Sequence, residues 1–105
     1  MKTIKTKHNL QFEVAPWSKD FSQFRVGTVE GLYRVTKESY EILAIANSKI
    51  GNGHIEDVWQ WFEASCKRDR KSLKVLEVWN KRFANYLTKK RGFTDIGNFN
   101  YEKKI

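Results

Sequence analysis

The feature that most constrains the fold is a succession of three patterns between Tyr40 and Trp79. The run Tyr40–Ala46 is almost entirely apolar, which is typical of a strand in the middle of a sheet with both faces covered. After a short loop, apolar residues recur at helical spacing, and Ser72–Trp79 then has the composition of a second strand. The helical stripe comprises Ile55, Val58, Trp59, Phe62 and Cys66. This order predicts two parallel neighbouring strands joined by a right-handed crossover.

The remaining segments predict further strands and one more helix around this unit. Leu10–Val14 alternates like a half-buried strand that Pro16 stops, and Trp17, Phe21 and Phe24 are spaced like one or two helical turns. Farther along, the sequence predicts a hairpin of Arg25–Val35 and Ser39–Asn47, a helix over Lys81–Arg91 closed by Gly92, and a last strand or hairpin bending at Gly97–Asn98. We therefore expect an α+β fold, a single mixed β-sheet with two main helices, as one domain spanning residues 1–105.

Composition places the chain among ordinary folded domains. It has 105 residues, of which 40% are hydrophobic and 30% charged. No window approaches 18 uninterrupted apolar residues and no apolar stretch follows the N-terminal lysines, so we expect a cytoplasmic protein without a membrane segment. The single cysteine, Cys66, forms no internal disulfide, and with only His8 and His54 beside it no metal site is expected.

The net charge of +8 is unevenly distributed along the chain. Residues 1–64 hold eight basic and eight acidic residues, whereas residues 65–105 hold twelve basic and four acidic ones. Two dense clusters are Lys67–Lys71 and Lys89–Arg91. They predict a positive face that attracts nucleic acid, an acidic protein or a small phosphorylated ligand. The alternative is that these residues only complement the negative ends of helix dipoles.

The loop between the first predicted parallel strand and its helix contains Gly51 and Gly53. A glycine loop before a helix exposes backbone amides at the positive end of the helix dipole, which suits a phosphate group. The alternative is a tight turn without a ligand. The loop lacks the Gly-Lys-Ser/Thr of a P-loop and the third glycine of a dinucleotide motif, which disfavours nucleotide hydrolysis and hydride transfer.

Aromatic residues are frequent, and two of the four tryptophans are expected in the core. Trp59 shares the apolar stripe of its helix and Trp79 ends a predicted strand. Trp61 falls off that stripe, so it is either exposed, and able to stack on a base or a partner, or packed against the N-terminal segment.

From Tyr40 to Phe93 the order of elements resembles the second half of a GCN5-related N-acetyltransferase (GNAT). The turn Ser48-Lys49-Ile50-Gly51-Asn52-Gly53 is similar to the family's Gln/Arg-x-x-Gly-x-Gly/Ala, with serine in place of the first Gln or Arg. The stretch from Asn80 to Gly92-Phe93 resembles the family's asparagine, short helix and closing Leu-Tyr-x-Lys-x-Gly-Phe.

The resemblance implies that acetyl-CoA binds between the two parallel strands and donates an acetyl group to a small-molecule or protein amine. Its implied contacts are Leu43, Ile45 and Ala46 along the pantetheine arm, the amides of Gly51, Asn52, Gly53 and His54 at the pyrophosphate, Lys49 as a supplementary charge, and Asn80 at the end of the second strand. A backbone amide near Ile45 would stabilise the oxyanion. Candidates for a general base are Glu41 and Glu30, either of which could instead be a solvated surface group.

Two departures from the family leave other functions open. Thr88 stands at the tyrosine position that can protonate the thiolate, and the nearest phenol is Tyr86, about 200° around the helix. The N-terminal half is also shortened, which predicts an acceptor site that is open, completed by a homodimer partner, or absent. The second hypothesis is therefore a non-catalytic, GNAT-like module whose basic C-terminal part binds nucleic acid or an acidic protein. A third is an accessory protein of the kind found in phages and mobile elements, acting by protein contact alone.

Overall fold

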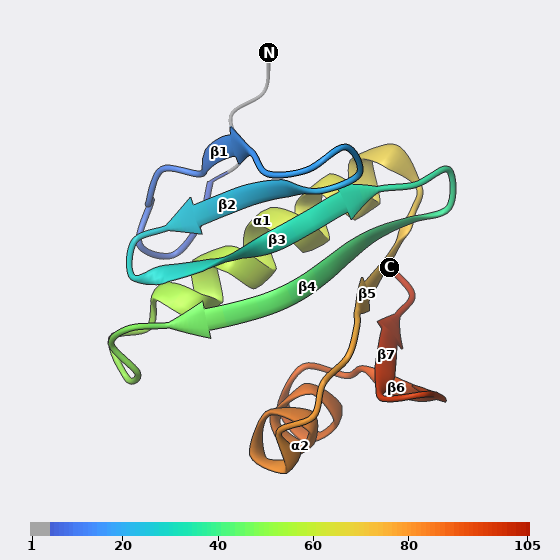
Figure 1. Ribbon diagram of the computed structural model, residues 1–105. Coiled ribbons are helices and arrows are strands. Elements are labelled where there is room, and N and C mark those ends of the chain that lie inside the picture. Colours follow the sequence, from blue (N-terminus) through green and yellow to red (C-terminus); the bar gives the residue numbers. More distant parts are fainter. Residues whose placement is uncertain (1–4) are drawn as a thin grey trace.

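The chain forms one mixed sheet of seven strands in the order β1-β2-β3-β4-β5-β7-β6, as seen in a computed structural model that describes residues 5–105 (Figure 1). The strands are β1 Glu13–Pro16, β2 Ser22–Val26, β3 Val29–Val35, β4 Ser39–Asn47, β5 Ser72–Val75, β6 Thr94–Gly97 and β7 Asn100–Lys103. Strands β4 and β5 run parallel, and the other five neighbouring pairs run antiparallel. The predicted α+β class with a single mixed sheet and two helices is confirmed.

One helix follows β4 along the chain, and the other follows β5. Helix α1 (His54–Asp69) crosses from β4 to β5, and its predicted apolar stripe faces the sheet with Val58, Trp59 and Phe62 fully buried. Helix α2 (Lys81–Lys90) begins at Asn80, whose side-chain oxygen accepts a hydrogen bond from the Phe83 amide. Both predicted helices are confirmed, and α2 ends one residue before its predicted end at Arg91.

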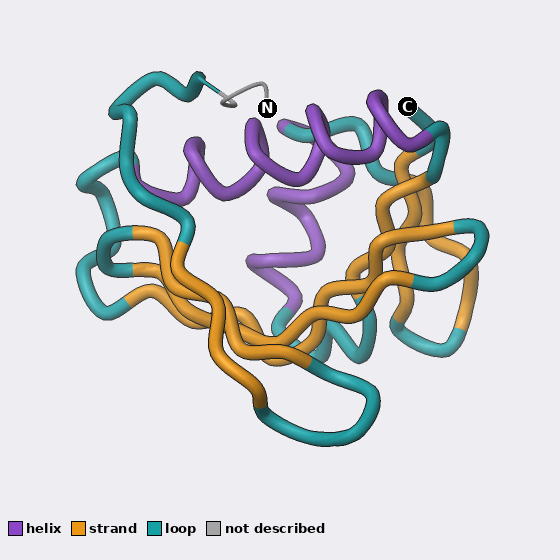
Figure 2. Tube along the Cα trace, turned by 90° about the horizontal axis from the view of Figure 1, so that it is seen from above, coloured by secondary structure: helices purple, strands orange, loops and turns teal. Residues whose placement is uncertain are grey.

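Figure 2 shows both helices on the same side of the curved sheet, with α1 lying across its concave face. The two helices touch where the indole Nε1 of Trp59 donates a hydrogen bond to Tyr86 Oη at 3.0 Å. The core lies between this helical layer and the sheet. It consists of Phe24, Val26, Val29, Tyr40, Ile42, Val58, Trp59, Phe62, Cys66, Leu73, Val75, Val78, Leu87 and Phe93.

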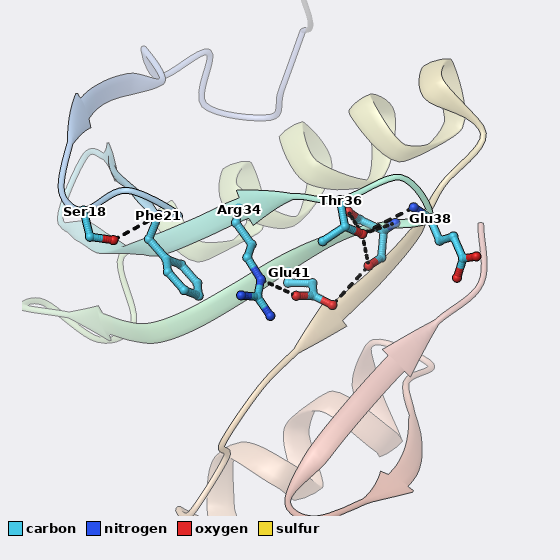
Figure 3. A network of polar contacts seen from close by, with 7 residues as sticks. Ser18, Phe21, Arg34, Thr36, Glu38 and Glu41 are labelled. Atoms are coloured by element: carbon cyan, nitrogen blue, oxygen red, sulfur yellow. Dashed lines mark hydrogen bonds and ion pairs between the residues drawn. The ribbon is translucent and has the colours of Figure 1, made fainter.

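The opposite face of the sheet carries charged side chains instead of a second layer. No helix covers it within residues 5–105. Across four adjacent strands the register places Arg34, Glu41, Lys74 and Glu102 in one row of alternating charge. Arg34 Nε donates to Glu41 Oε1 at 2.6 Å, on the near side of the sheet in Figure 3, with α1 behind it. The central strand is nevertheless buried at every position from Ser39 to Ile42, so the prediction that it is covered on both faces is wrong only for Leu43–Asn47, where exposed and half-buried residues alternate. Strand β4 does lie in the middle of the sheet.

The N-terminal part differs most from the sequence-based expectation. The first strand is displaced and ends with Pro16, whose missing amide is tolerated because β1 is an edge strand. Helical turns through Phe24 are not formed. That residue belongs to β2, because its side chain completes the aromatic core against Tyr33 and Phe62. The expected strand Arg25–Val35 is divided between β2 and β3 by a two-residue turn at Gly27 and Thr28.

The C-terminal part confirms the predicted hairpin and corrects two details. Strands β6 and β7 pair around a turn at Asn98 and Phe99, each with a positive φ. The strand expected over Ser72–Trp79 ends at Val75, and Trp79 is not in the core. Its side chain is 66% exposed and lies on Phe99 with ring centroids 4.1 Å apart. Trp61 follows the packing alternative, because its ring stacks on Phe12 of the N-terminal segment at 3.6 Å.

Candidate functional site

The parallel strands β4 and β5 separate after a short paired stretch. Their register runs from Ser39 and Ser72 to Ile42 and Val75, and the Leu76 amide makes one further hydrogen bond to the Ile42 carbonyl at 2.9 Å. The chain then leaves the sheet edge, where the Val78 amide bonds to the Phe99 carbonyl at 2.8 Å. Beyond Ile42, β4 is paired with β3 alone, so the edge that faced β5 becomes free.

A β-bulge accompanies this separation. Ala44 has a φ of 56°, and the pairing of β3 with β4 shifts register between Glu30 and Leu32. Gly31 lies opposite the bulge, and a Cβ at that position would lie 3.1 Å from the Ile45 Cα and 3.0 Å from the Phe24 ring. Only glycine fits there without displacement of the backbone. The bulge bends the second half of β4 away from β5, as bulges beside binding sites commonly do.

A cavity of about 350 Å³ lies where the strands separate. It is lined by Ile45, Ala46, Asn47, Ile50, Gly51, Ile55, Asn80, Arg82, Phe83 and Tyr86. The lining is mainly apolar, with a few polar groups from β4 and α2, which is the usual make-up of a small-molecule pocket. Five of the sequence-predicted positions meet here, namely Ile45, Ala46, Gly51, Asn80 and Tyr86.

Two polar side chains of the cavity are held in place by other hydrogen bonds. Tyr86 Oη accepts the indole N–H of the fully buried Trp59, which leaves its own hydrogen available for donation to a ligand. The carboxamide oxygen of Asn80 caps α2 at the Phe83 amide, so its NH₂ group is the part left to contact a ligand. Thr88, by contrast, is exposed on the outer side of α2 and bonds back to the Ala84 carbonyl at 3.2 Å.

The glycine loop is fixed by its own side chains. Asn52 Oδ1 accepts the His54 amide at 3.0 Å, and Asn52 Nδ2 donates to Thr28 Oγ1 at 2.8 Å. The His54 amide is therefore already engaged within the loop. The amides of Gly51 and Gly53 make no hydrogen bond to any residue between 5 and 105. A Cβ built on Gly51 would meet no atom within 4 Å, so the backbone there is open to a ligand.

The two acidic residues after the loop do not oppose an anion, because both face the N-terminal segment. Asp57 is fully buried and accepts hydrogen bonds from Thr6 Oγ1 at 2.6 Å, the His8 amide at 2.9 Å and the Leu10 amide at 3.0 Å. Burial alone would raise the pKa of Asp57, but these hydrogen bonds outweigh it and lower the pKa. Glu56 pairs with Lys7 at 3.2 Å.

Several predicted site residues lie outside the cavity. Glu41 is on the charged face of the sheet, where Arg34 and Ser39 donate to its two carboxylate oxygens. Leu43 faces the same side, paired with Leu32. Lys49 is exposed in the loop, and its amide bonds to Asn47 Oδ1 at 3.0 Å. The alternative carboxylate, Glu30, is exposed and pairs with Arg25.

Four residues that line the cavity were not among the predicted site residues: three are apolar and one is an arginine. Ile50, Ile55 and Phe83 form the walls, and Arg82 stands among them. A signal for Phe83 is present in the sequence, because it precedes Tyr86 by three residues and so shares its helix face. The two rings lie 6.1 Å apart at an interplanar angle of 15°. Nothing in the sequence places Ile50, which is 89% exposed at the tip of the loop.

The described part of the chain holds no group of three or more potential metal-binding side chains. None of its helices combines the length and the apolar character needed to cross a membrane. Comparison of the chain with protein-family models, curated proteins and solved structures found no match.

Proposed function

We propose that the chain is an acetyl-CoA-dependent N-acetyltransferase. The observation that carries the proposal is the cavity of about 350 Å³ at the separation of β4 and β5. It gathers residues from β4, the glycine loop and the start of α2, the three segments on which the resemblance to GNAT enzymes rests. The β-bulge at Ala44 supports the same reading, because it frees one edge of β4 beside the cavity.

The residues present fit acetyl-CoA. The apolar walls formed by Ile45, Ile55 and Phe83 suit the amide-and-alkyl arm of the cofactor, and Arg82 offers a positive charge to its phosphates. At Gly51 the open backbone lets a diphosphate approach the amides before α1. Bound acetyl-CoA supplies an acetyl group on a thioester, ready for transfer to an amine.

Two chemical roles fall to groups of this chain at the cavity. A backbone amide on the free edge of β4 near Ile45 stabilises negative charge on the carbonyl oxygen, a contribution of about 3 kcal/mol for one positioned donor. As the new N–C bond forms and the C–S bond breaks, Tyr86 Oη donates its proton to the departing sulfur. Glu41 lies on the other face of the sheet and the cavity lining holds no carboxylate, so the attacking amine loses its proton to solvent water. The acceptor is a small-molecule or protein amine that approaches the cavity from solvent, beside the exposed Ile50.

Calorimetric titration with acetyl-CoA tests the proposal. We expect binding by the unmodified protein and at least about tenfold weaker binding by Gly51→Asp, because the new carboxylate repels the diphosphate. The matched control is Gly97→Asp. Gly97 has a φ of +89° against +95° for Gly51, and an added Cβ also meets nothing within 4 Å there, so the two variants carry the same backbone strain and the same charge.

The outcomes separate clearly. If Gly51→Asp loses acetyl-CoA affinity and Gly97→Asp retains it, the result supports acetyl-CoA binding at the cavity. The absence of heat at about 1 mM acetyl-CoA, or an equal loss in both variants, would refute the proposal.

A further inference from the structure

A second hollow, of about 340 Å³, lies at the end of α1 opposite to the cavity. Three segments converge on it: Lys67, Arg70 and Lys71 at the end of α1, Ser72 of β5, and Glu102 and Lys104 from β7 and the residue after it. Four of these residues are basic and one is acidic. Because α1 has 16 residues, its two ends are about 24 Å apart, so this hollow is distinct from the proposed acetyltransferase site.

The cations of this hollow are not neutralised within the protein. Lys67, Arg70 and Lys104 have no carboxylate within 4.0 Å in the described part of the chain. Lys71 Nζ donates to the neutral carbonyl of Thr36, so its charge also persists. Three nearby basic residues are paired instead: Arg68 with Asp69, and both Arg91 and Lys103 with Glu63.

The helix dipole does not account for the arrangement. It favours Lys67 in the last turn of α1, but Lys104 follows strand β7, and the dipole of α1 does not explain its presence there. Arg70 occupies the left-handed position after α1, with a φ of 58°, where glycine is the usual residue. A basic side chain therefore stands at a position where backbone preference alone would select against it.

A second basic cluster joins the same region. Lys89 and Lys90 end α2, and the next residue, Arg91, binds Glu63 of α1 at 2.8 Å. Glu63 lies about one turn before Lys67, so both clusters that stand out in the sequence approach the C-terminal half of α1. The molecule measures 35 × 33 × 26 Å, a length comparable with one turn of a nucleic-acid duplex, about 34 Å.

We propose that this basic hollow binds the phosphate backbone of nucleic acid. Its lining contains one apolar residue, Ile105, and no aromatic ring, so it offers neither the apolar anchor of a typical protein interface nor a surface for stacking bases. Unpaired lysine and arginine side chains around a polar hollow suit closely spaced phosphates, without selection of sequence. This inference is independent of the acetyltransferase proposal.

Fluorescence anisotropy with a labelled 20-bp DNA duplex, across a series of salt concentrations, tests the inference. With three free cations engaged, the slope of log K against log salt should be about −2.7, and affinity should fall about 40-fold between 50 and 200 mM salt. Arg70→Gln with Lys104→Gln should reduce the slope to about −1. The matched control, Lys5→Gln with Lys19→Gln, removes two other exposed and unpaired positive charges and should leave the slope unchanged.

Each outcome decides the matter. The same duplex made of RNA shows which nucleic acid is bound, since both present the phosphates on which the inference rests. The inference would be overturned by a slope near zero, or by an equal loss of DNA affinity in the two double variants. Tighter binding to polyglutamate or to anionic lipid vesicles than to either duplex would also overturn it. Circular dichroism of all variants ensures that folded proteins are compared.

Discussion

The two halves of β4 have the same kind of sequence and opposite structural roles. Ser39–Ile42 is buried at every position and hydrogen-bonded to neighbours on both edges, whereas Leu43–Asn47 alternates between half-buried and exposed and is paired on one edge. The bulge at Ala44 marks the boundary. The first half stabilises the sheet, and the second half gives up one set of backbone pairings to form a wall of the cavity. A candidate site therefore arises where the central strand stops contributing fully to stability.

The largest difference in stability between the two halves of β4 should appear when one isoleucine in each half is replaced by alanine. Ile42 is fully buried, so Ile42→Ala should lower the free energy of unfolding by about 3–4 kcal/mol through lost burial and a residual cavity. Ile45 is half-buried and lines the open cavity, so Ile45→Ala should cost about 1 kcal/mol. Urea unfolding of both variants measures this difference. Equal losses would show that the open half is packed as tightly as the paired half.

The next effect concerns the first turn of α1, beside the open half of β4. Asp57→Ala should cost about 2–3 kcal/mol, because it leaves the Thr6 hydroxyl and the amides of His8 and Leu10 without their acceptor. The pKa of Asp57 is lowered below its ordinary 3.8 in the folded protein. Its stabilisation is therefore fully present above about pH 4 and is lost as pH falls through the lowered pKa.

Unfolding measured between pH 7 and pH 2 tests the acid part of this prediction. Asp57→Asn should flatten the loss of stability at low pH, whereas Asp20→Asn, at an exposed loop position, should not. Identical acid profiles for Asp57→Asn and the unmodified protein would contradict the assignment of Asp57 as an ionised anchor of the N-terminal segment.

The sequence was most informative where a single pattern decides the structure. The stripe from Ile55 to Cys66 and the apolar run of β4 were enough for both the crossover and the central strand. The pattern failed where a tertiary contact decides: Phe24 has helical spacing from Trp17, yet the aromatic cluster with Tyr33 and Phe62 holds it in β2.

The candidate site could be anticipated only in part, for a similar reason. Its glycine loop and the positions of Asn80 and Tyr86 follow from the order of elements. Which face of β4 each side chain occupies depends on the bulge at Ala44, a local backbone irregularity that composition does not encode. Glu41 therefore lies on the charged face, outside the cavity lining.

A smaller change should distinguish the chemistry of the cavity from its packing. Tyr86→Phe leaves the buried Trp59 indole N–H without an acceptor and should cost about 1.5 kcal/mol of stability. If the hydroxyl protonates the leaving sulfur, acetyl transfer should fall about 100-fold or more while acetyl-CoA affinity changes by less than about twofold. Tyr101→Phe, at another half-buried tyrosine, is the control and should leave both unchanged. A loss of affinity equal to the loss of rate would instead make Tyr86 a wall residue only.

The smallest effect compares two ion pairs on the charged face, one beside each half of β4. Arg34 and Glu41 lie at the paired half, with side chains 38% and 11% exposed, whereas Arg25 and Glu30 are 58% and 49% exposed at the level of the open half. Because water screens the second pair more strongly, double-mutant cycles to alanine should give a coupling of about 1 kcal/mol for Arg34 with Glu41 and about 0.3 kcal/mol for Arg25 with Glu30. About 1 M salt should abolish the second coupling and only reduce the first. Equal couplings that respond equally to salt would mean that both pairs are solvated to the same degree. The boundary at Ala44 would then divide the hydrogen bonding of β4 but not the electrostatics of its charged face.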